Sequence, residues 1–242
     1  MQSVATEISF NNDNAHQYKA EVEFRSKEER STDLINLYKD LEDDTSTSMP
    51  DGKKSTAFDK INAVYGFKKA DVKKYTVEEL LGNEDVAAVL GTTVSIAEND
   101  VNRFYRQVHA YVDSTSRPRR RLDPAQAQNA GIQIGQLWPL IRVMRIYTAA
   151  EILASGVTIV DLPGTQDANA ARCRISKEYQ EKCAAIWVVT PITRAVDDEV
   201  AQNVLGEDFT TQLKADGDVV KVTFICTKTD DIGLEETFRD LI

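Results

Sequence analysis

Two short stretches of this sequence place an acidic residue at or just beyond the end of an apolar run. In the first, residues 157–164 read Val-Thr-Ile-Val-Asp-Leu-Pro-Gly, so that Asp161 follows four β-branched residues. Such a run is typical of a strand buried on both faces of a parallel sheet, and Pro-Gly predicts an immediate turn. Open α/β sheets bind their ligands at the carboxyl ends of such strands. Asp161 is therefore a candidate for holding Mg²⁺ and the Gly164 amide for facing a terminal phosphate, although an ordinary Asp-containing turn is the alternative.

The second stretch is Thr227-Lys228-Thr229-Asp230, which follows an apolar run at residues 219–226. A carboxylate just beyond a strand end can accept two hydrogen bonds from the N1 and N2 donors of guanine, which adenine does not offer. A site built on such buried polar pairing discriminates by roughly 10⁴- to 10⁵-fold. The aliphatic stem of Lys228 can lie along the plane of the base. The tetrapeptide alone is common, but its position two strand–helix units after Asp161 favours a guanine site.

The elements around these stretches alternate in a way that predicts a layered α/β fold. From Gly156 onward the patterns read strand, helix, strand, helix, strand and helix, with the later strands at residues 184–190 and 219–226. This order predicts a parallel sheet with right-handed crossovers. Two further strands are expected upstream. Residues 18–24 alternate as a half-exposed strand near a sheet edge, and residues 140–147 are predicted to pair antiparallel with the strand before Asp161.

The middle of the chain is charged and mainly helical. Leucines at residues 34, 37 and 41 share one helical face, a second such face follows at residues 61–65, and a third helix is expected from Val101 to about Ser114. We therefore expect residues 1–25 and 139–242 to form the core domain and residues 26–138 to form a mainly helical insertion.

Composition narrows the range of functions. The 242 residues carry a net charge of −10, which argues against general binding to nucleic acid or anionic membranes. The 3 cysteines favour a reducing compartment. No run is long and apolar enough to cross a bilayer, so we expect a soluble chain in the cytoplasm or the nucleus. The arginine cluster at residues 117–121 is read as a solvated loop rather than an import signal.

Taken together, the motifs resemble those of the dynamin superfamily of large GTPases, in particular a nuclear-GTPase-like branch. The resemblance covers nearly the whole chain. The residues that carry it are Ser3-Val4-Ala5-Thr6-Glu7-Ile8, Trp138-Pro139-Leu140-Ile141, Ile159-Val160-Asp161-Leu162-Pro163-Gly164, Thr193-Arg194-Ala195-Val196-Asp197-Asp198 and Thr227-Lys228-Thr229-Asp230.

The resemblance implies GTP as ligand, Mg²⁺ as cofactor and hydrolysis by an attacking water. It implies that Thr6 brings its hydroxyl to Mg²⁺ and its carbonyl toward the catalytic water, and that Asp161 steadies the metal. By the same resemblance, the Gly164 amide binds the γ-phosphate, and Lys228 and Asp230 hold guanine together with the rest of their motif, including Thr227. The family's dimers further imply a G-domain homodimer, with the loop around Arg194 facing the partner.

One expected motif is missing from these 242 residues. A working GTPase of this class needs Gly-x-x-x-x-Gly-Lys-Ser/Thr to bind the phosphates, and Gly52-Lys53-Lys54-Ser55 does not match it. We therefore expect an incomplete P-loop NTPase-type G domain, with a mostly parallel sheet flanked by helices, that begins downstream of the phosphate loop. Such a chain is expected to bind GTP poorly. Without the loop's strand, the strands at residues 157–161 and 184–190 are expected to lie two strand spacings apart, about 10 Å.

Two alternatives remain open from the sequence. The first is a pseudo-GTPase that acts as a protein-interaction module through its helical insertion. The second is an unrelated doubly wound domain, for example a flavodoxin-like regulator, which leaves the Thr227–Asp230 run unexplained.

Overall fold

The computed structural model describes residues 4–13, 15–42, 51–67, 70–112, 135–162, 179, 182–194 and 221–231. The chain divides into two compact units, Met1–Cys173 and Arg174–Ile242, and each is described by itself.

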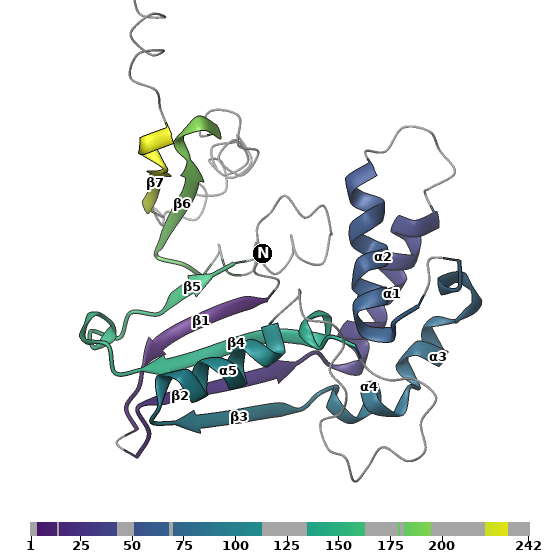
Figure 1. Cartoon of the computed structure of the whole chain (residues 1–242), viewed down its shortest axis with the longest axis horizontal. Coiled ribbons are helices and arrows are strands. Elements are labelled where there is room, and N and C mark those ends of the chain that lie inside the picture. The colour runs from purple at the N-terminus through teal and green to yellow at the C-terminus, as the bar shows by residue number, and fades with distance from the viewer. Residues whose placement is uncertain are drawn as a thin grey trace, which may run out of the picture. The chain divides into compact units, whose positions relative to one another are not determined.

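The first unit is built on a five-stranded sheet with the strand order β3-β2-β4-β1-β5 (Figure 1). β1 and β4 run parallel, whereas β1 with β5, β2 with β3 and β2 with β4 are antiparallel. The described part of this unit is therefore a mixed α/β fold with a mixed sheet. The strands are β1 (Ala5–Phe10), β2 (Tyr18–Phe24), β3 (Thr93–Glu98), β4 (Ile141–Thr148) and β5 (Ile159–Asp161).

The expectation of a mostly parallel sheet is wrong for this unit, where antiparallel pairs dominate. An antiparallel sheet can keep one polar face, and the polar–apolar alternation of β2 suits such a sheet. β2 is confirmed as a strand, but it lies one position in from the edge because β3 pairs along its outer side. β4 is also confirmed, yet its expected antiparallel partner β5 is not its neighbour, since β1 lies between them.

β5 differs most from its prediction. It is a strand of three residues at the edge of the sheet, it runs antiparallel to β1, and two of its three residues are exposed. A strand buried on both faces of a parallel sheet was expected there. Its edge position leaves one flank without a strand partner among the described residues, and this accounts for the exposure of Ile159, at 44%.

The helices lie between β2 and β3 and directly after β3. α1 begins with a capping box, because the Ser26 hydroxyl accepts from the Glu29 amide while the Glu29 carboxylate accepts from the Ser26 amide. α3 is capped in the same way by Thr76 and Glu79. The helices are α1 (Lys27–Glu42), α2 (Asp51–Tyr65), α3 (Val77–Leu81), α4 (Glu84–Val89) and α5 (Val101–Val112), with short 3₁₀ turns at Val72–Lys74, Trp138–Leu140 and Glu151–Leu153.

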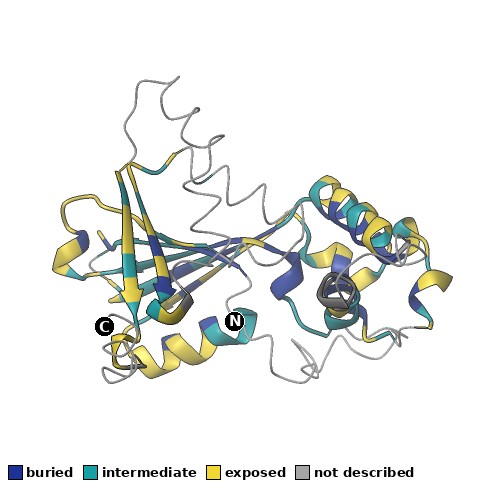
Figure 2. Cartoon of the chain, turned by 90° about the horizontal axis from the view of Figure 1, so that it is seen from above, coloured by how far each residue is buried: buried dark blue, intermediate teal, exposed yellow. Residues whose placement is uncertain are grey.

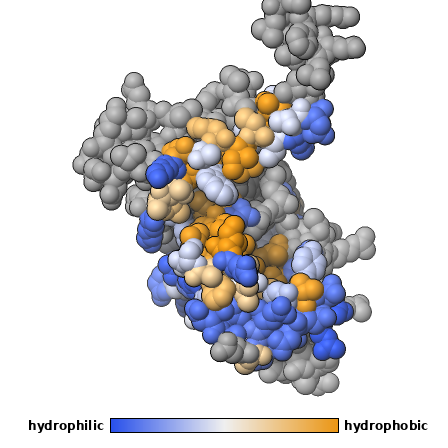
Figure 3. All heavy atoms as spheres, turned by 90° about the vertical axis from the view of Figure 1, so that its left-hand side faces the viewer, coloured by the Kyte–Doolittle hydropathy of each residue, from blue (hydrophilic) through white to orange (hydrophobic). Residues whose placement is uncertain are grey.

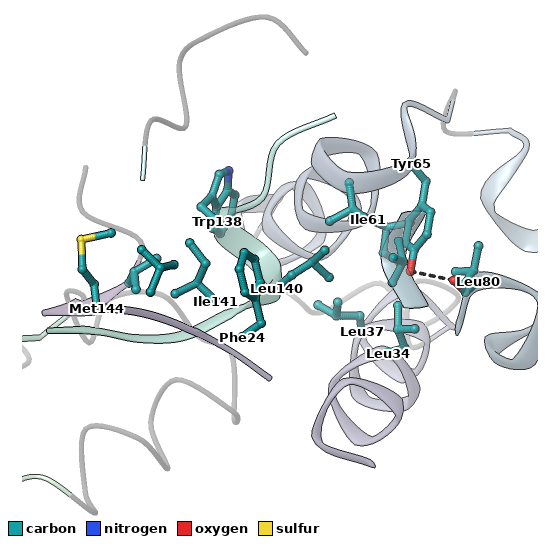
Figure 4. Packing of buried hydrophobic residues seen from close by; sticks show 14 of the residues in the cluster. Phe24, Leu34, Leu37, Ile61, Tyr65, Leu80, Trp138, Leu140, Ile141 and Met144 are labelled. Carbon is teal, nitrogen blue, oxygen red and sulfur yellow. Dashed lines mark hydrogen bonds between the residues drawn. The ribbon is translucent and has the colours of Figure 1, made fainter. Parts of the chain in front are cut away.

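One hydrophobic core joins these helices to the sheet (Figure 4). The predicted apolar faces are confirmed, since Leu34 and Leu37 of α1 and Ile61 of α2 are fully buried. Figure 2 shows how burial is distributed, with buried residues along the sheet and on the inner sides of the helices. α5 covers one face of the sheet, where Phe104 stacks on Tyr18 of β2 with ring centroids 5.6 Å apart. Burying this apolar face supplies most of the driving force for folding.

The opposite sheet face carries charged side chains in register across three strands. The Arg145 guanidinium of β4 donates to Glu7 of β1 at 3.1 Å and to Glu23 of β2 at 2.7 Å. Arg142 also donates to Glu23, at 2.9 Å. Because the side chains on one face of adjacent strands lie next to one another, each positive group here faces a negative one.

The second unit contains two parallel strands, β6 (Ala185–Pro191) and β7 (Lys221–Thr227), each followed by a 3₁₀ turn, Ile192–Arg194 and Thr229–Asp231. Both strands and their parallel pairing are confirmed. Full burial is not, because Trp187 is 67% and Val189 60% exposed. β6 belongs to a different sheet from β5 among the described residues, so Asp161 and Asp230 do not follow strands of one shared sheet. The expected 10 Å separation of β5 and β6 stays a prediction.

Several large hydrophobic side chains remain at the surface, and Figure 3 shows exposed hydrophobic residues among the hydrophilic ones. In the first unit the most exposed of them is Ile152, at 78%, within the turn that joins β4 to β5. Within the ranges described above, no helix combines the length and the apolar character needed to cross a membrane.

Candidate functional site

Two predicted metal-binding residues lie opposite each other on neighbouring strands. In the β1–β5 ladder, Thr6 pairs with Asp161. Residues directly opposite in an antiparallel pair have their Cβ atoms about 4.5–5.5 Å apart, with both side chains on the same face. A threonine and an aspartate that are 155 positions apart in sequence therefore occupy facing positions at the end of β5. Both are oxygen donors of the kind that Mg²⁺ prefers.

The two side chains differ in their surroundings. Thr6 is buried, 4% exposed, and its hydroxyl donates to the Val4 carbonyl at 3.4 Å. Asp161 is exposed, yet partial burial of its carboxyl raises the pKa of Asp161 above the ordinary value of 3.8. A raised pKa means that the charged carboxylate lacks full solvation. A cation bound there would supply the missing stabilisation.

Thr6 lies inside the sheet rather than in a loop. It pairs with Met144 of β4 on one side and with Asp161 of β5 on the other. The resemblance implied a threonine whose carbonyl is available to a water molecule. In a strand paired on both sides, the backbone groups are used by the ladder, so the hydroxyl is the part of Thr6 suited to a ligand.

The predicted guanine-recognition motif lies where β7 ends. Thr227 is the last residue of β7, and its hydroxyl donates to the carbonyl of Thr190 in β6 at 3.4 Å. Lys228 follows with a φ of 54°, a left-handed conformation that residues other than glycine rarely adopt. Asp230 then lies within the 3₁₀ turn Thr229–Asp231.

The backbone at Lys228 has an unusual conformation. Among the described residues, Lys228 is the one residue other than glycine that has a positive φ. Such a conformation costs on the order of 1–2 kcal/mol, and strain of this kind concentrates at ligand-binding positions. The turn redirects the chain directly after the strand and places Lys228, Thr229 and Asp230 beyond its carboxyl end.

Several predicted features lie outside the described residues. Gly164, the arginine cluster at residues 117–121 and the acidic pair at residues 197–198 are among them. Of the two halves of the predicted site, Thr6 and Asp161 belong to the first unit, and Thr227, Lys228 and Asp230 belong to the second. The Gly52–Ser55 segment is helical, within the first turns of α2, as expected for a sequence that is not a phosphate loop.

A comparison with models of protein families identifies the family of the chain. A model described as the dynamin family matches residues 2–228. The chain belongs to the dynamin family. The match includes Thr6, Asp161, Thr227 and Lys228, so these positions all lie within the segment that the family model covers.

Curated relatives agree with this assignment. The chain is 26% identical over 233 residues to "Nuclear GTPase SLIP-GC" of Mus musculus and equally to the Homo sapiens protein of that name. Each alignment covers 93% of this chain and 28% of the relative, so the dynamin-family segment described here spans little more than a quarter of their length.

Solved structures of an oligomerised bacterial dynamin pair, reported to provide a mechanism for long-range sensing and tethering of membranes, are also similar. One of these chains matches with a TM-score of 0.46 and 16% identity, covering 98% of this chain and 24% of its own length. Another matches with a TM-score of 0.49 and 13% identity, covering 98% of this chain and 29% of its own.

Sequence reasoning missed Thr190. It is 2% exposed and its carbonyl receives the Thr227 hydroxyl, which ties the ends of β6 and β7 together beneath the motif. The signal available was positional: Thr190 comes near the end of the strand that precedes β7 in sequence, and parallel neighbours end at the same sheet edge.

Proposed function

We propose that this chain is part of a guanine-nucleotide-binding, GTP-hydrolysing domain of the dynamin type. The observation that carries the proposal is the register of β1 against β5, which sets Thr6 opposite Asp161. The family resemblance selects the same two residues for the metal and phosphate end of the nucleotide. The left-handed backbone at Lys228 supports the proposed binding of the guanine base, because this strained conformation falls within the predicted guanine-recognition motif.

At the phosphate end, Thr6 and Asp161 offer a hydroxyl and a carboxylate, and Mg²⁺ usually takes one or two protein oxygens while keeping water and phosphate as its other ligands. The metal would neutralise charge that develops on the phosphate during transfer. Asp161 would hold it, and the Thr6 hydroxyl would complete the protein's contribution. The Gly164 amide is assigned to the γ-phosphate.

At the base end, Asp230 accepts hydrogen bonds from the N1 and N2 groups of guanine. Lys228 covers one face of the ring with its aliphatic stem. Thr227 fixes the start of the motif through its bond to Thr190. The binding preference then rests on Asp230, because an adenine base would leave this carboxylate unpaired.

The affinity of the 242-residue chain is expected to be low, because its sequence contains no Gly-x-x-x-x-Gly-Lys-Ser/Thr motif to supply amides and a lysine to the phosphates. We place the core domain at residues 1–25 and 139–242 and the helical insertion at residues 26–138. A G-domain homodimer, and a cytoplasmic or nuclear location, belong to the same proposal.

The same missing motif favours a second candidate, a pseudo-GTPase that serves as a protein-interaction module. Both candidates retain the fold, but they differ in whether the chain distinguishes nucleotides at all. A chain that shows no preference between GTP and ATP at millimolar concentration supports the interaction module.

The experiment is a titration of the 242-residue chain with GTP, ATP and XTP in the presence of Mg²⁺, followed by calorimetry. We expect weak binding with GTP preferred over ATP. Asp230→Asn should shift the preference from GTP to XTP, because an amide can donate to the 2-oxo group of xanthine where a carboxylate cannot. Glu151→Gln, which removes an exposed acid outside the site, is the matched control. Equal affinities of the Asp230→Asn variant for GTP and XTP would remove the guanine assignment.

A further inference from the structure

β3 forms one edge of the five-stranded sheet. It pairs with β2 over six consecutive positions, from Thr93 opposite Glu23 to Glu98 opposite Tyr18, with no shift of register. Its side chains alternate: Ile96 is buried under the α5 side of the sheet, whereas Thr93, Ser95 and Ala97 are exposed. Gln107 of α5 donates to the Glu98 carboxylate at 2.6 Å and helps hold the strand in place.

The hydrogen bonds around β3 show which backbone groups face outward. The Phe24 amide donates to the Thr92 carbonyl at 2.9 Å, so these two backbone groups face each other at a hydrogen-bonded position of the ladder, while the Thr92 amide donates to the Val89 carbonyl. Such pairs alternate with non-hydrogen-bonded pairs along an antiparallel ladder. Val94, Ile96 and Glu98 therefore bond to β2. The amides and carbonyls of Thr93, Ser95 and Ala97 point away from the sheet, where no described strand pairs with them.

This edge lacks the devices that usually prevent strand pairing. Natural edge strands are shortened, bulged, or interrupted by lysine or proline. The sequence of β3, Thr-Val-Ser-Ile-Ala-Glu, has neither residue, and its single charge lies at the last position. The opposite edge is protected, because β5 has only three residues and ends in Asp161.

We propose that β3 is a docking edge for a second copy of this chain. Two β3 strands pair antiparallel about a twofold axis that passes beside Ser95, and the sheets of the two copies become one. Only the outward-facing residues can form the hydrogen-bonded pairs, and this requirement fixes the register. Ser95 faces Ser95 of the second copy, and Thr93 faces Ala97 of the second copy. Each of these pairs exchanges both of its N–H···O bonds.

The side chains match in this register on both faces. On the α5 side, Val94 meets Ile96 of the second copy, so apolar groups continue across the junction. On the other side, small polar and apolar groups at positions 93, 95 and 97 meet one another. Glu98 falls opposite Thr92 of the second copy, which keeps the two Glu98 side chains about 20 Å apart at roughly 3.4 Å of rise per residue.

This self-complementarity identifies the occupant as a second copy rather than an unrelated extended peptide. An isologous contact uses the same residues on both partners, so one short sequence must satisfy both sides. The β3 sequence does so without placing two like charges opposite each other. The pairing involves no nucleotide-binding residue and is independent of the proposed function.

The test is sedimentation velocity of the 242-residue chain over a concentration series without nucleotide. We expect a monomer–dimer equilibrium. Because residue 95 faces itself, Ser95→Lys and Ser95→Glu should each weaken dimerisation about two- to fivefold, in line with the effect of like charges directly opposite in a sheet. An equimolar mixture of the two variants should restore it.

Two further variants complete the test. Ser95→Pro removes an outward amide that β2 does not use, so the fold is retained and dimerisation is lost. Ser95→Thr keeps the amide and is the matched control, with dimerisation unchanged. A native chain that stays monomeric at its highest soluble concentration overturns the proposal. So does a dimer whose dissociation constant is the same in the Ser95→Lys variant, the Ser95→Glu variant and their mixture.

Discussion

Replacing Asp33 by alanine would leave a guanidinium inside the core without its partner. Arg30, at the end of the first turn of α1, is 0% exposed, and its Nη1 donates to the Asp33 carboxylate at 2.7 Å. The Arg30 Nε and Nη2 atoms are buried and have no hydrogen-bond partner among the residues that the structure describes. The Tyr65 ring lies 6.0 Å from the guanidinium carbon and provides a further favourable contact. Asp33 is itself 5% exposed, so this ion pair is buried on both sides.

The expected cost follows from this geometry. Breaking a buried ion pair by removing one partner costs about 3–5 kcal/mol, because the remaining charge is uncompensated. Arginine cannot relieve the cost by losing its proton. The cation–π contact with Tyr65 remains and is worth about 1–2 kcal/mol. We therefore expect Asp33→Ala to lower the free energy of unfolding by about 3 kcal/mol, near the lower end of that range. In a chain of this size, 1 kcal/mol shifts Tm by about 2–4 °C, so Tm should fall by about 6–12 °C.

The assay is urea unfolding followed by circular dichroism, and the chain provides its own control. Lys74 and Asp71 form an ion pair with the same 2.7 Å distance and the same spacing, but their side chains are 70% and 37% exposed. Asp71→Ala should therefore cost less than about 1 kcal/mol. The double variant Arg30→Met/Asp33→Leu should recover much of the loss, since apolar groups of similar volume can replace a buried pair. Equal costs for Asp33→Ala and Asp71→Ala would refute the role given to burial.

Three further outcomes can be measured in the same way. Leu34→Ala should lower the free energy of unfolding by about 2–5 kcal/mol, because Leu34 is fully buried. Ile35→Ala, at the next position, which is 44% exposed, should lower it by less than about 1 kcal/mol. Similar values for the two variants would contradict the described core. Burial raises the pKa of Glu23, but the hydrogen bonds and positive charges of Arg145 and Arg142 together outweigh this effect and hold that pKa below its ordinary 4.5. Its stabilisation should therefore be present above pH 4.5 and be lost on further acidification, and Glu23→Gln should remove this part of the acid dependence of the urea midpoint. Gly156→Ala should cost about 1–2 kcal/mol because φ is 86° there, although the space beside it is open, and an unchanged urea midpoint would contradict this.

The sequence predicts the elements better than their pairing. The apolar stripes of α1 and α2 and the runs that become β6 and β7 have clear periodicity, and the structure confirms them. β3 was not predicted, because six residues directly before a helix give a weak strand pattern. The direction of β5 was also inaccessible, since side-chain alternation does not distinguish parallel from antiparallel neighbours.

The candidate site shows the same limit. Motif spacing singled out Asp161 and the Thr227–Asp230 run, because each stands at or just beyond the end of an apolar strand. The adjacency of Thr6 and Asp161 depends on the register of two strands distant in sequence, and no local pattern contains that register. The left-handed turn at Lys228 was equally hidden, since lysine carries no preference for a positive φ.

The place of β1 between β4 and β5 has a kinetic consequence. Residue 5 finds its first strand partner only at residue 143, and Thr6 finds its other partner at residue 161. During synthesis at about 5–20 residues per second, this strand would wait on the order of 10 seconds with both flanks open. The helices at residues 27–65 can collapse in that interval, because helix formation is local. We therefore expect closure of the sheet to be the slow, chaperone-sensitive step in the maturation of this protein.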